Sequence, residues 1–140
     1  MSKVAVVYWS GTGNTEAMAN AVATGAEEKG AEVSIFTPTE FSNDKVAEFD
    51  SIAFGCPAMG AEELEDSEFE PMFSSCLPTL SGKKVALFGS YGWGDGEWMR
   101  TWEETTINAG VTLATESFIC TDFPDDDAIT ACKELGSALA

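Results

Sequence analysis

The chain has 140 residues, of which 44% are hydrophobic, and its 24 acidic and 7 basic side chains give a formal net charge of −17. We expect it to form one domain, residues 1–140, whose core needs no disulfide or metal. So acidic a surface repels polyphosphates and anionic lipids, which argues against nucleic acid and membranes as partners and favours proteins with basic surfaces. Solubility or adaptation to salt explains the same charge equally well.

Segments with strand-like and helix-like patterns alternate along the chain. In chain order we expect strands at residues 3–8, 32–36, 51–54, 84–88 and 111–119, and helices near residues 14–29, 44–49, 70–80, 96–108 and 125–139. Such alternation predicts βαβ crossovers and a parallel sheet.

The predicted strands differ in polarity, and this difference predicts where each of them lies. Residues 4–7, 52–54 and 85–88 are continuously apolar, which is typical of strands covered on both faces. The segments at 32–36 and 111–119 alternate with polar residues, as edge strands can. The sequence therefore predicts an α/β fold, a doubly wound five-stranded parallel sheet with strand order 2-1-3-4-5 and helices on both faces. This order puts the switch point, where such sheets bind ligands, between strands one and three.

The cysteines and the missing histidine limit the chemistry. Cys56, Cys76, Cys120 and Cys132 form no CxxC pair and show no zinc-like spacing. Because we recognise no export signal and no stretch of transmembrane length, we expect reduced core thiols in a cytoplasmic protein. Without histidine the chain lacks the commonest general base and metal ligand, so we expect no catalytic residue and no metal site.

The loop after the first strand has the composition of a phosphate site. It reads Ser10, Gly11, Thr12, Gly13, Asn14 and Thr15. Two glycines let backbone N–H groups converge where the positive end of the next helix points inward, which suits a phosphate. The simpler alternative is a polar strand–helix turn with Thr12 as the N-cap. The loop lacks the lysine of a P-loop and the third glycine of the dinucleotide fingerprint, so a monophosphate held by uncharged donors fits better.

Two further loops follow the third and fourth strands at the same sheet edge. The first contains Met59 and Gly60 between Cys56 and Glu62, and the second places Trp93 between two glycines. A flat heteroaromatic ring needs a stacking partner on each face, which Met59 and Trp93 can supply. Either side chain, taken alone, is explained equally well as a core residue.

The motifs at residues 8–15, 55–60 and 89–94 resemble those of short-chain flavodoxins, and the similarity extends over the length and element order of the chain. The resemblance implies FMN, with the isoalloxazine between Met59 and Trp93, Gly60 beside N5, and Glu62 accepting a hydrogen bond from N3–H. Main-chain groups of residues 90–93 would meet the pyrimidine end. The implied binding residues are Ser10, Gly11, Thr12, Gly13, Asn14, Thr15, Pro57, Ala58, Met59, Gly60, Glu62, Ser90, Tyr91, Gly92 and Trp93.

The same resemblance implies a low-potential one-electron carrier, not an enzyme, that shuttles between the semiquinone and the anionic hydroquinone of FMN. We expect a monomer that passes electrons between redox enzymes. Acidic residues beside the ring loops supply a physical reason for the low potential, because they oppose the addition of negative charge. A flavin-dependent quinone reductase of the same fold is the alternative, although 140 residues leave little chain for a substrate pocket.

Gly60 carries a further hypothesis. When the flavin takes up an electron and a proton, N5 gains an N–H, and the carbonyl of residue 60 can accept it only if the peptide to Ala61 turns over. Glycine makes that rotation cheap because it tolerates both signs of φ. Alternatively, Gly60 serves only to let the backbone approach the ring.

Overall fold

The computed structural model describes residues 2–11, 13–59, 63–92 and 94–140. It contains one five-stranded parallel sheet in the order β2-β1-β3-β4-β5, which confirms the predicted fold and strand order. The strands are β1 (Lys3–Tyr8), β2 (Glu32–Phe36), β3 (Ser51–Gly55), β4 (Lys84–Tyr91) and β5 (Phe118–Thr121). The helices are α1 (Asn14–Glu28), α2 (Asn43–Val46), α3 (Phe69–Cys76), α4 (Glu97–Asn108) and α5 (Asp126–Leu139), with short 3₁₀ turns at Pro38–Glu40 and Leu77–Thr79.

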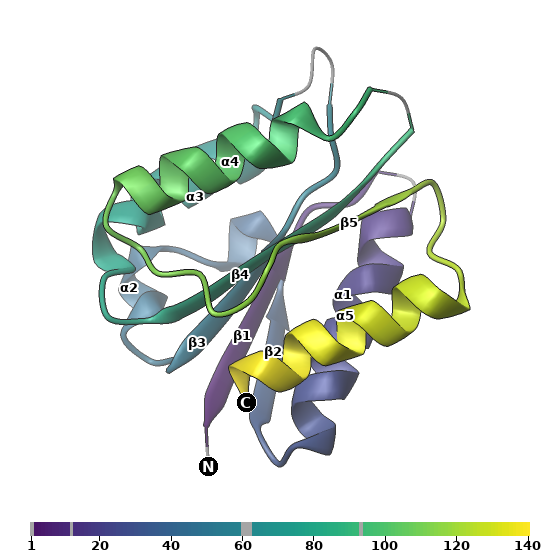
Figure 1. Ribbon diagram of the computed structural model, residues 1–140. Coiled ribbons are helices and arrows are strands. Elements are labelled where there is room, and N and C mark those ends of the chain that lie inside the picture. Colours follow the sequence, from purple (N-terminus) through teal and green to yellow (C-terminus); the bar gives the residue numbers. More distant parts are fainter. Residues whose placement is uncertain (1, 12, 60–62, 93) are drawn as a thin grey trace.

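Helices cover both faces of the sheet, as predicted. Helices α1 and α5 lie on one face, and α2, α3 and α4 lie on the other (Figure 1). Alternate residues of each central strand enter opposite cores, so that in β1 Val4 and Val6 pack under α1 and α5 while Ala5 and Val7 pack under the other helices. Because both faces are covered, these strands must be apolar at every position.

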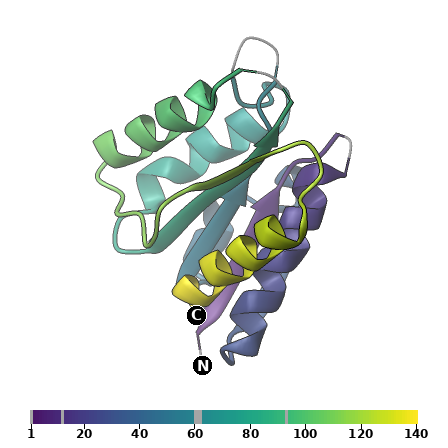
Figure 2. The ribbon, with the colours of Figure 1, turned by 45° about the vertical axis from the view of Figure 1, so that its right-hand side comes forward.

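Helices α1 and α5 pack backbone to backbone (Figure 2). A Cβ atom at Gly25 would lie 2.0 Å from the carbonyl oxygen of Lys133, and one at Gly136 would lie 1.9 Å from that of Val22. Any larger side chain would force the helices apart. The hydroxyl of Ser137 also donates to the carbonyl oxygen of Gly25 at 3.2 Å.

Three predicted elements were longer than those observed. The strand expected at 111–119 is confined to Phe118–Thr121, preceded by an isolated bridge between Val85 and Leu113. The hydroxyl of Ser117 donates to the Glu103 carboxylate of α4 at 2.8 Å, and this bond holds the intervening chain against the helix. The helix expected at 70–80 ends at Cys76 and continues as the 3₁₀ turn that contains Pro78, which has no N–H for the α-helical ladder. The helix expected at 44–49 ends at Val46.

All four cysteines are free, and Cys56, Cys76 and Cys132 are buried as predicted, whereas Cys120 on the edge strand is half-buried and so is not a core thiol. Among the described residues no helix is long and apolar enough to cross a membrane.

Candidate functional site

The sheet brings the three predicted loops to one edge. The backbone N–H of Trp9 donates to the carbonyl oxygen of Gly55 at 3.0 Å, and that of Ala58 donates to the carbonyl oxygen of Ser90 at 3.0 Å. A cavity of about 290 Å³ opens between the loops. Its walls are Trp9, Gly11, Asn14, Pro57, Ala58, Met59, Ser90, Tyr91, Gly92 and Asp122, most of which were predicted site residues.

The loop before α1 presents hydrogen-bond donors that suit an anion. Gly13 is the N-cap of α1 with φ of 95°, a conformation that favours glycine, so the alternative in which Thr12 caps the helix is wrong. The hydroxyl oxygen of Ser10 accepts hydrogen bonds from the backbone N–H groups of Gly13 at 3.0 Å and Glu16 at 3.3 Å. A hydroxyl oxygen accepts two hydrogen bonds and donates one, so the Ser10 proton remains available for a ligand.

The donor set of this loop fits a phosphate monoester. The first N–H groups of a helix have no acceptor within the helix, so those of Asn14 and Thr15 add to the Ser10 hydroxyl at the positive end of α1. A second cavity of about 360 Å³ adjoins the loop, with Tyr8, Ser10 and Gly13 among its walls. No described lysine or arginine lines either cavity, which agrees with a phosphate held by neutral donors.

Thr15 and Ser90 contact each other inside the protein. Their hydroxyl oxygens are 3.1 Å apart, and the residues are 1% and 4% exposed. The side chain of Thr15 therefore joins the first loop to the third. Its backbone N–H remains one of the donors at the start of α1 that suit a phosphate.

The second loop is held at both ends. Met59 and Glu63 exchange backbone hydrogen bonds of 2.8 and 2.9 Å. The N–H of Glu65 donates to the sulfur of Cys56 at 3.4 Å. The Glu65 carboxylate accepts hydrogen bonds from the N–H groups at the start of α3, at 2.9 Å from Ser67 and 2.8 Å from Phe69. A third cavity of about 240 Å³ is lined by Trp9, Met59, Glu63, Leu64, Glu65 and Asp66.

These contacts shift two pKa values in opposite directions. Burial raises the pKa of Glu65. Hydrogen bonds from the Ser67 hydroxyl and from the backbone N–H groups of Phe69, Glu68 and Ser67 outweigh burial and lower this pKa to about 2. Burial raises the pKa of the Cys56 thiol to about 12, so this thiol stays protonated. The Glu65 carboxylate is thus ionised at neutral pH and anchors the loop, and the Cys56 thiol is unreactive there.

Four predicted site residues, Thr12, Gly60, Glu62 and Trp93, lie outside the described residues. Two residues that line the 290 Å³ cavity, Trp9 and Asp122, were not predicted. Trp9 lines all three cavities and stood in the first motif. Asp122 lines the first cavity, and a Cβ atom at Gly92 would lie 3.6 Å from its carboxylate oxygen. Asp122 directly follows β5 at the same sheet edge, but the predicted fifth strand ended at residue 119, so this position was missed.

The fold and the site together define a class of protein. A parallel sheet of order 2-1-3-4-5, with uncharged hydrogen-bond donors at the start of α1 that suit a phosphate, is typical of a flavodoxin-like mononucleotide-binding domain. The flavodoxin family profile matches residues 6–136. The chain is 50% identical over 137 residues to a flavodoxin of Megasphaera elsdenii, covering 98% of both chains, and 46% identical over 135 residues to one of Clostridium beijerinckii, covering 96% of this chain and 97% of that one.

Solved structures agree with these sequence comparisons. The solution structure of two-electron reduced Megasphaera elsdenii flavodoxin superposes with a TM-score of 0.88 at 50% identity, covering 97% of both chains. A flavodoxin from the domain Archaea superposes with a TM-score of 0.88 at 31% identity, covering 99% of this chain and 96% of that one. The chain belongs to the flavodoxin family. It is therefore an FMN-binding electron carrier and not an enzyme, and no comparison favours the quinone reductase alternative.

Proposed function

We propose that FMN binds across the cavities at the carboxyl ends of β1, β3 and β4, with its phosphate at the start of α1. The Ser10 hydroxyl carries this proposal, because two backbone N–H groups occupy its lone pairs and leave its proton for the phosphate. The proposed contacts comprise Ser10, Gly11, Thr12, Gly13, Asn14, Thr15, Pro57, Ala58, Met59, Gly60, Glu62, Ser90, Tyr91, Gly92 and Trp93, to which we add Trp9 and Asp122.

FMN supplies the one-electron chemistry, and the protein tunes it. Glu63, Asp66 and Asp122 line the cavities, and each carboxylate opposes the addition of negative charge there. At ~10 Å in water each charge costs about 0.4 kcal/mol, or roughly 20 mV for a one-electron couple. Several carboxylates acting together favour a low-potential carrier.

The charge distribution supports basic redox partners. With a net charge of −17, the chain attracts proteins with basic surfaces and repels a second copy of itself, so we propose a monomer. The free thiols support our proposal that it acts in the reducing cytoplasm. Residues 1–140 act as a single FMN-binding domain in this proposal.

Two measurements test the proposed function. The apoprotein should bind FMN much more tightly than riboflavin, because the loop before α1 contacts the phosphate; equal affinities would place the phosphate elsewhere. Electron transfer from the reduced holoprotein to a basic redox protein should slow as ionic strength rises, since salt screens exposed charges beyond about 8 Å. Electron-transfer rates that do not change with salt would mean that the acidic surface serves solubility and not docking.

A further inference from the structure

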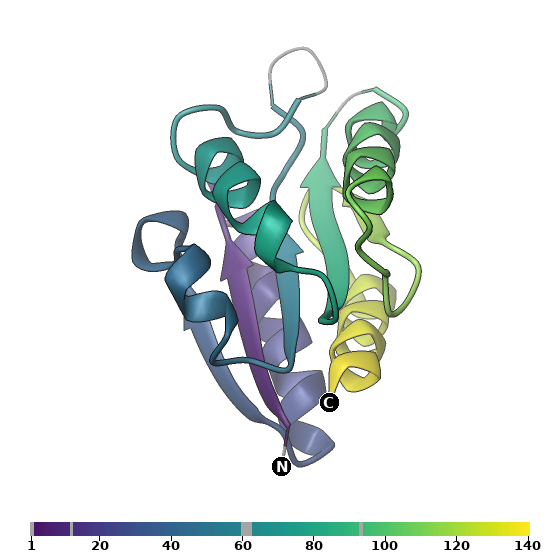
Figure 3. The same ribbon diagram turned by 90° about the vertical axis from the view of Figure 1, so that its left-hand side faces the viewer.

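Residues of α3 and α4 line a groove outside the FMN cavities. These two helices lie on the face of the sheet opposite α1 and α5 (Figure 3). Its volume is about 410 Å³. The apolar walls are Leu64, Phe73, Leu77, Trp98 and Trp102, with the exposed helix positions Thr101 and Thr105 along one side. The groove shares Glu63, Leu64 and Asp66 with the 240 Å³ cavity that Met59 lines, so it adjoins the FMN region without being part of it.

Large aromatic side chains fill the space between these two helices. Trp102 of α4 packs edge-on against Phe69 and Phe73 of α3, with ring centroids 5.5 Å apart in both pairs. This packing differs from that of α1 and α5, where glycines bring the backbones together. The groove lies over this packing, and its two indoles are nearly covered, with Trp98 1% and Trp102 2% exposed.

The groove contacts the second loop of the site, which follows β3. The indole N–H of Trp98 donates to the carbonyl oxygen of Cys56 at 3.3 Å, directly before Pro57. At the other end of that loop, Glu63 pairs with Met59 and also lines the groove. An occupant of the groove would therefore contact the residues that hold the loop.

One polar group in this region is unpaired. Within residues 2–11, 13–59, 63–92 and 94–140, the indole Nε1 of Trp102 is the only buried side-chain nitrogen or oxygen with no hydrogen-bond partner. Native proteins rarely leave such a group unpaired, because its desolvation is not compensated. The unpaired group belongs to the aromatic packing between α3 and α4 that lines the groove.

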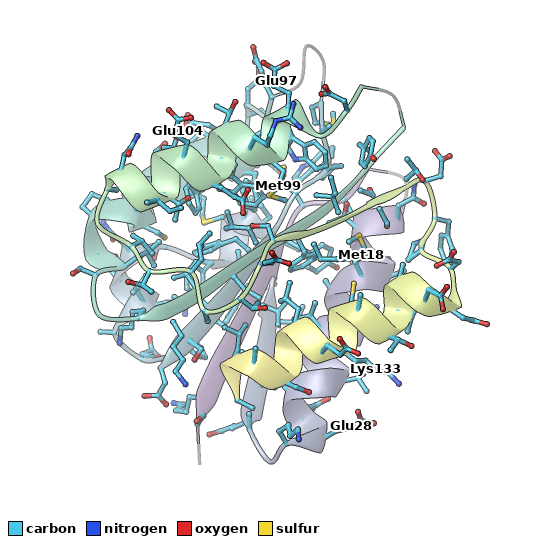
Figure 4. All side chains as sticks on the ribbon, in the orientation of Figure 1. Met18, Glu28, Glu97, Met99, Glu104 and Lys133 are labelled. Atoms are coloured by element: carbon cyan, nitrogen blue, oxygen red, sulfur yellow. The ribbon has the colours of Figure 1, made fainter. Side chains whose placement is uncertain are left out.

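The rim of the groove sets the charge of the occupant. Glu63, Asp66 and Glu70 are exposed along it, and no described lysine or arginine lines it. We call these three the rim carboxylates. Glu97 and Glu104 add negative charge on the outer side of α4, while Met99 points to the sheet (Figure 4). A second copy of this chain would bring another charge of −17 and is the wrong complement.

We propose that the α3–α4 groove docks a basic segment of a redox partner, which inserts one large apolar side chain over Trp98 and Trp102. Lysine or arginine side chains that flank this anchor pair with the rim carboxylates. An aromatic or aliphatic anchor in a desolvated pocket, surrounded by polar contacts, is the common form of an interface hot spot. The inference rests on the proposed function, because it identifies one place where the basic partner binds.

The test uses the FMN-loaded protein and two peptides, Ac-Arg-Lys-Phe-Lys-Arg-NH₂ and Ac-Arg-Lys-Ser-Lys-Arg-NH₂. Binding is followed by the NMR signals of the Trp98 and Trp102 indole N–H groups. The phenylalanine peptide should shift both signals saturably and bind about tenfold more tightly than the serine peptide, the effect of burying one aromatic side chain. Equal affinities of the two peptides, or shifts that spread over the acidic surface without the indoles, would overturn the proposal.

A pair of tryptophan substitutions separates the groove from general charge attraction. Thr105→Trp fills the groove from an exposed position of α4 and should weaken the phenylalanine peptide about tenfold. Thr130→Trp, at an exposed position of α5 on the other face, is the matched control and should leave the affinity unchanged. Equal effects of the two substitutions on peptide affinity would contradict docking in the groove. The visible spectrum of bound FMN reports the proposed function separately, so its loss would not be mistaken for failed docking.

Discussion

The hydroxyl oxygens of Thr15 and Ser90 lie 3.1 Å apart although 75 positions separate the residues in the chain. The contact joins the start of α1, where the phosphate loop ends, to the end of β4, where the third loop begins. Both side chains are buried, so water cannot replace a partner that is lost. The placement of α1 against the sheet edge depends in part on this bond.

Thr15→Val should destabilise the apoprotein. Valine keeps the branched shape but leaves the Ser90 hydroxyl buried and unpaired, so the free energy of unfolding in urea should fall by about 1–3 kcal/mol. Thr15→Ser should restore most of it. Thr24→Val, on the same helix, is the control because its hydroxyl bonds only the carbonyl oxygen of Asn20. A valine variant as stable as the parent would show that the Thr15–Ser90 bond contributes nothing.

Ser10→Ala should weaken FMN by about 1–3 kcal/mol, the effect of losing a hydrogen bond to a charged group. Riboflavin, which has no phosphate, should bind the variant and the parent alike. Titration of the apoprotein with each ligand, followed by flavin fluorescence, gives both affinities. Ser75→Ala, at an exposed position of α3, controls for serine removal. If Ser10→Ala reduced both affinities equally, the Ser10 hydroxyl would not contact the phosphate.

Asp122→Asn should raise the one-electron potentials of bound FMN by roughly 20 mV at low ionic strength, because one carboxylate beside the cavity is removed. The backbone of Asp122 has φ of 54°, and asparagine tolerates this conformation well, so the change removes charge and keeps the turn. Glu28→Gln, at the far end of α1, removes an equal charge far from the site (Figure 4). Potentiometric titration should find a smaller shift of the one-electron potentials for Glu28→Gln than for Asp122→Asn. Equal shifts for the two variants would mean that only net charge matters.

Glu65→Gln should lower the free energy of unfolding at neutral pH by about 1.5–3 kcal/mol, because the amide replaces a charged acceptor at the start of α3. The folded pKa of about 2 lies below the ordinary 4.5, so the ionised carboxylate stabilises the fold. That contribution is complete above the ordinary pKa and disappears as the pH falls through about 2. Denaturant titrations should therefore show the two proteins converging in acid. Glu68→Gln, at an exposed neighbouring position, is the control for the removal of one carboxylate at neutral pH.

Polarity along the chain was sufficient to predict the sheet. The apolar residues 4–7 and 85–88 are fully buried in central strands, and the mixed segment 32–36 is an edge. Strand β5 was placed too early, because its start depends on the bond between Ser117 and Glu103, which joins residues that the local pattern treats separately.

The site was predictable where chain order alone brings loops together. The ends of adjacent parallel strands must meet, so the cavity walls at Gly11, Pro57 and Tyr91 were found from the loop sequences. Pairings between side chains could not be predicted in this way. The bond between Thr15 and Ser90, and the position of Asp122 beside Gly92, depend on how α1 and β5 seat against the sheet.

The glycine contact between α1 and α5 also constrains how the protein is made. Gly25 belongs to the first helix and Ser137, which bonds its carbonyl oxygen, stands 112 positions later, near the end of α5. During synthesis, the face of the sheet that α5 covers stays open to solvent until α5 has left the ribosome. The Ser51 hydroxyl, which donates to the carbonyl oxygen of Leu139 at 2.8 Å, also has no such partner until α5 is made. Nascent chains that end before α5 should expose Val22 and Met18 to chaperones, and the docking of α5 should close this face of the domain.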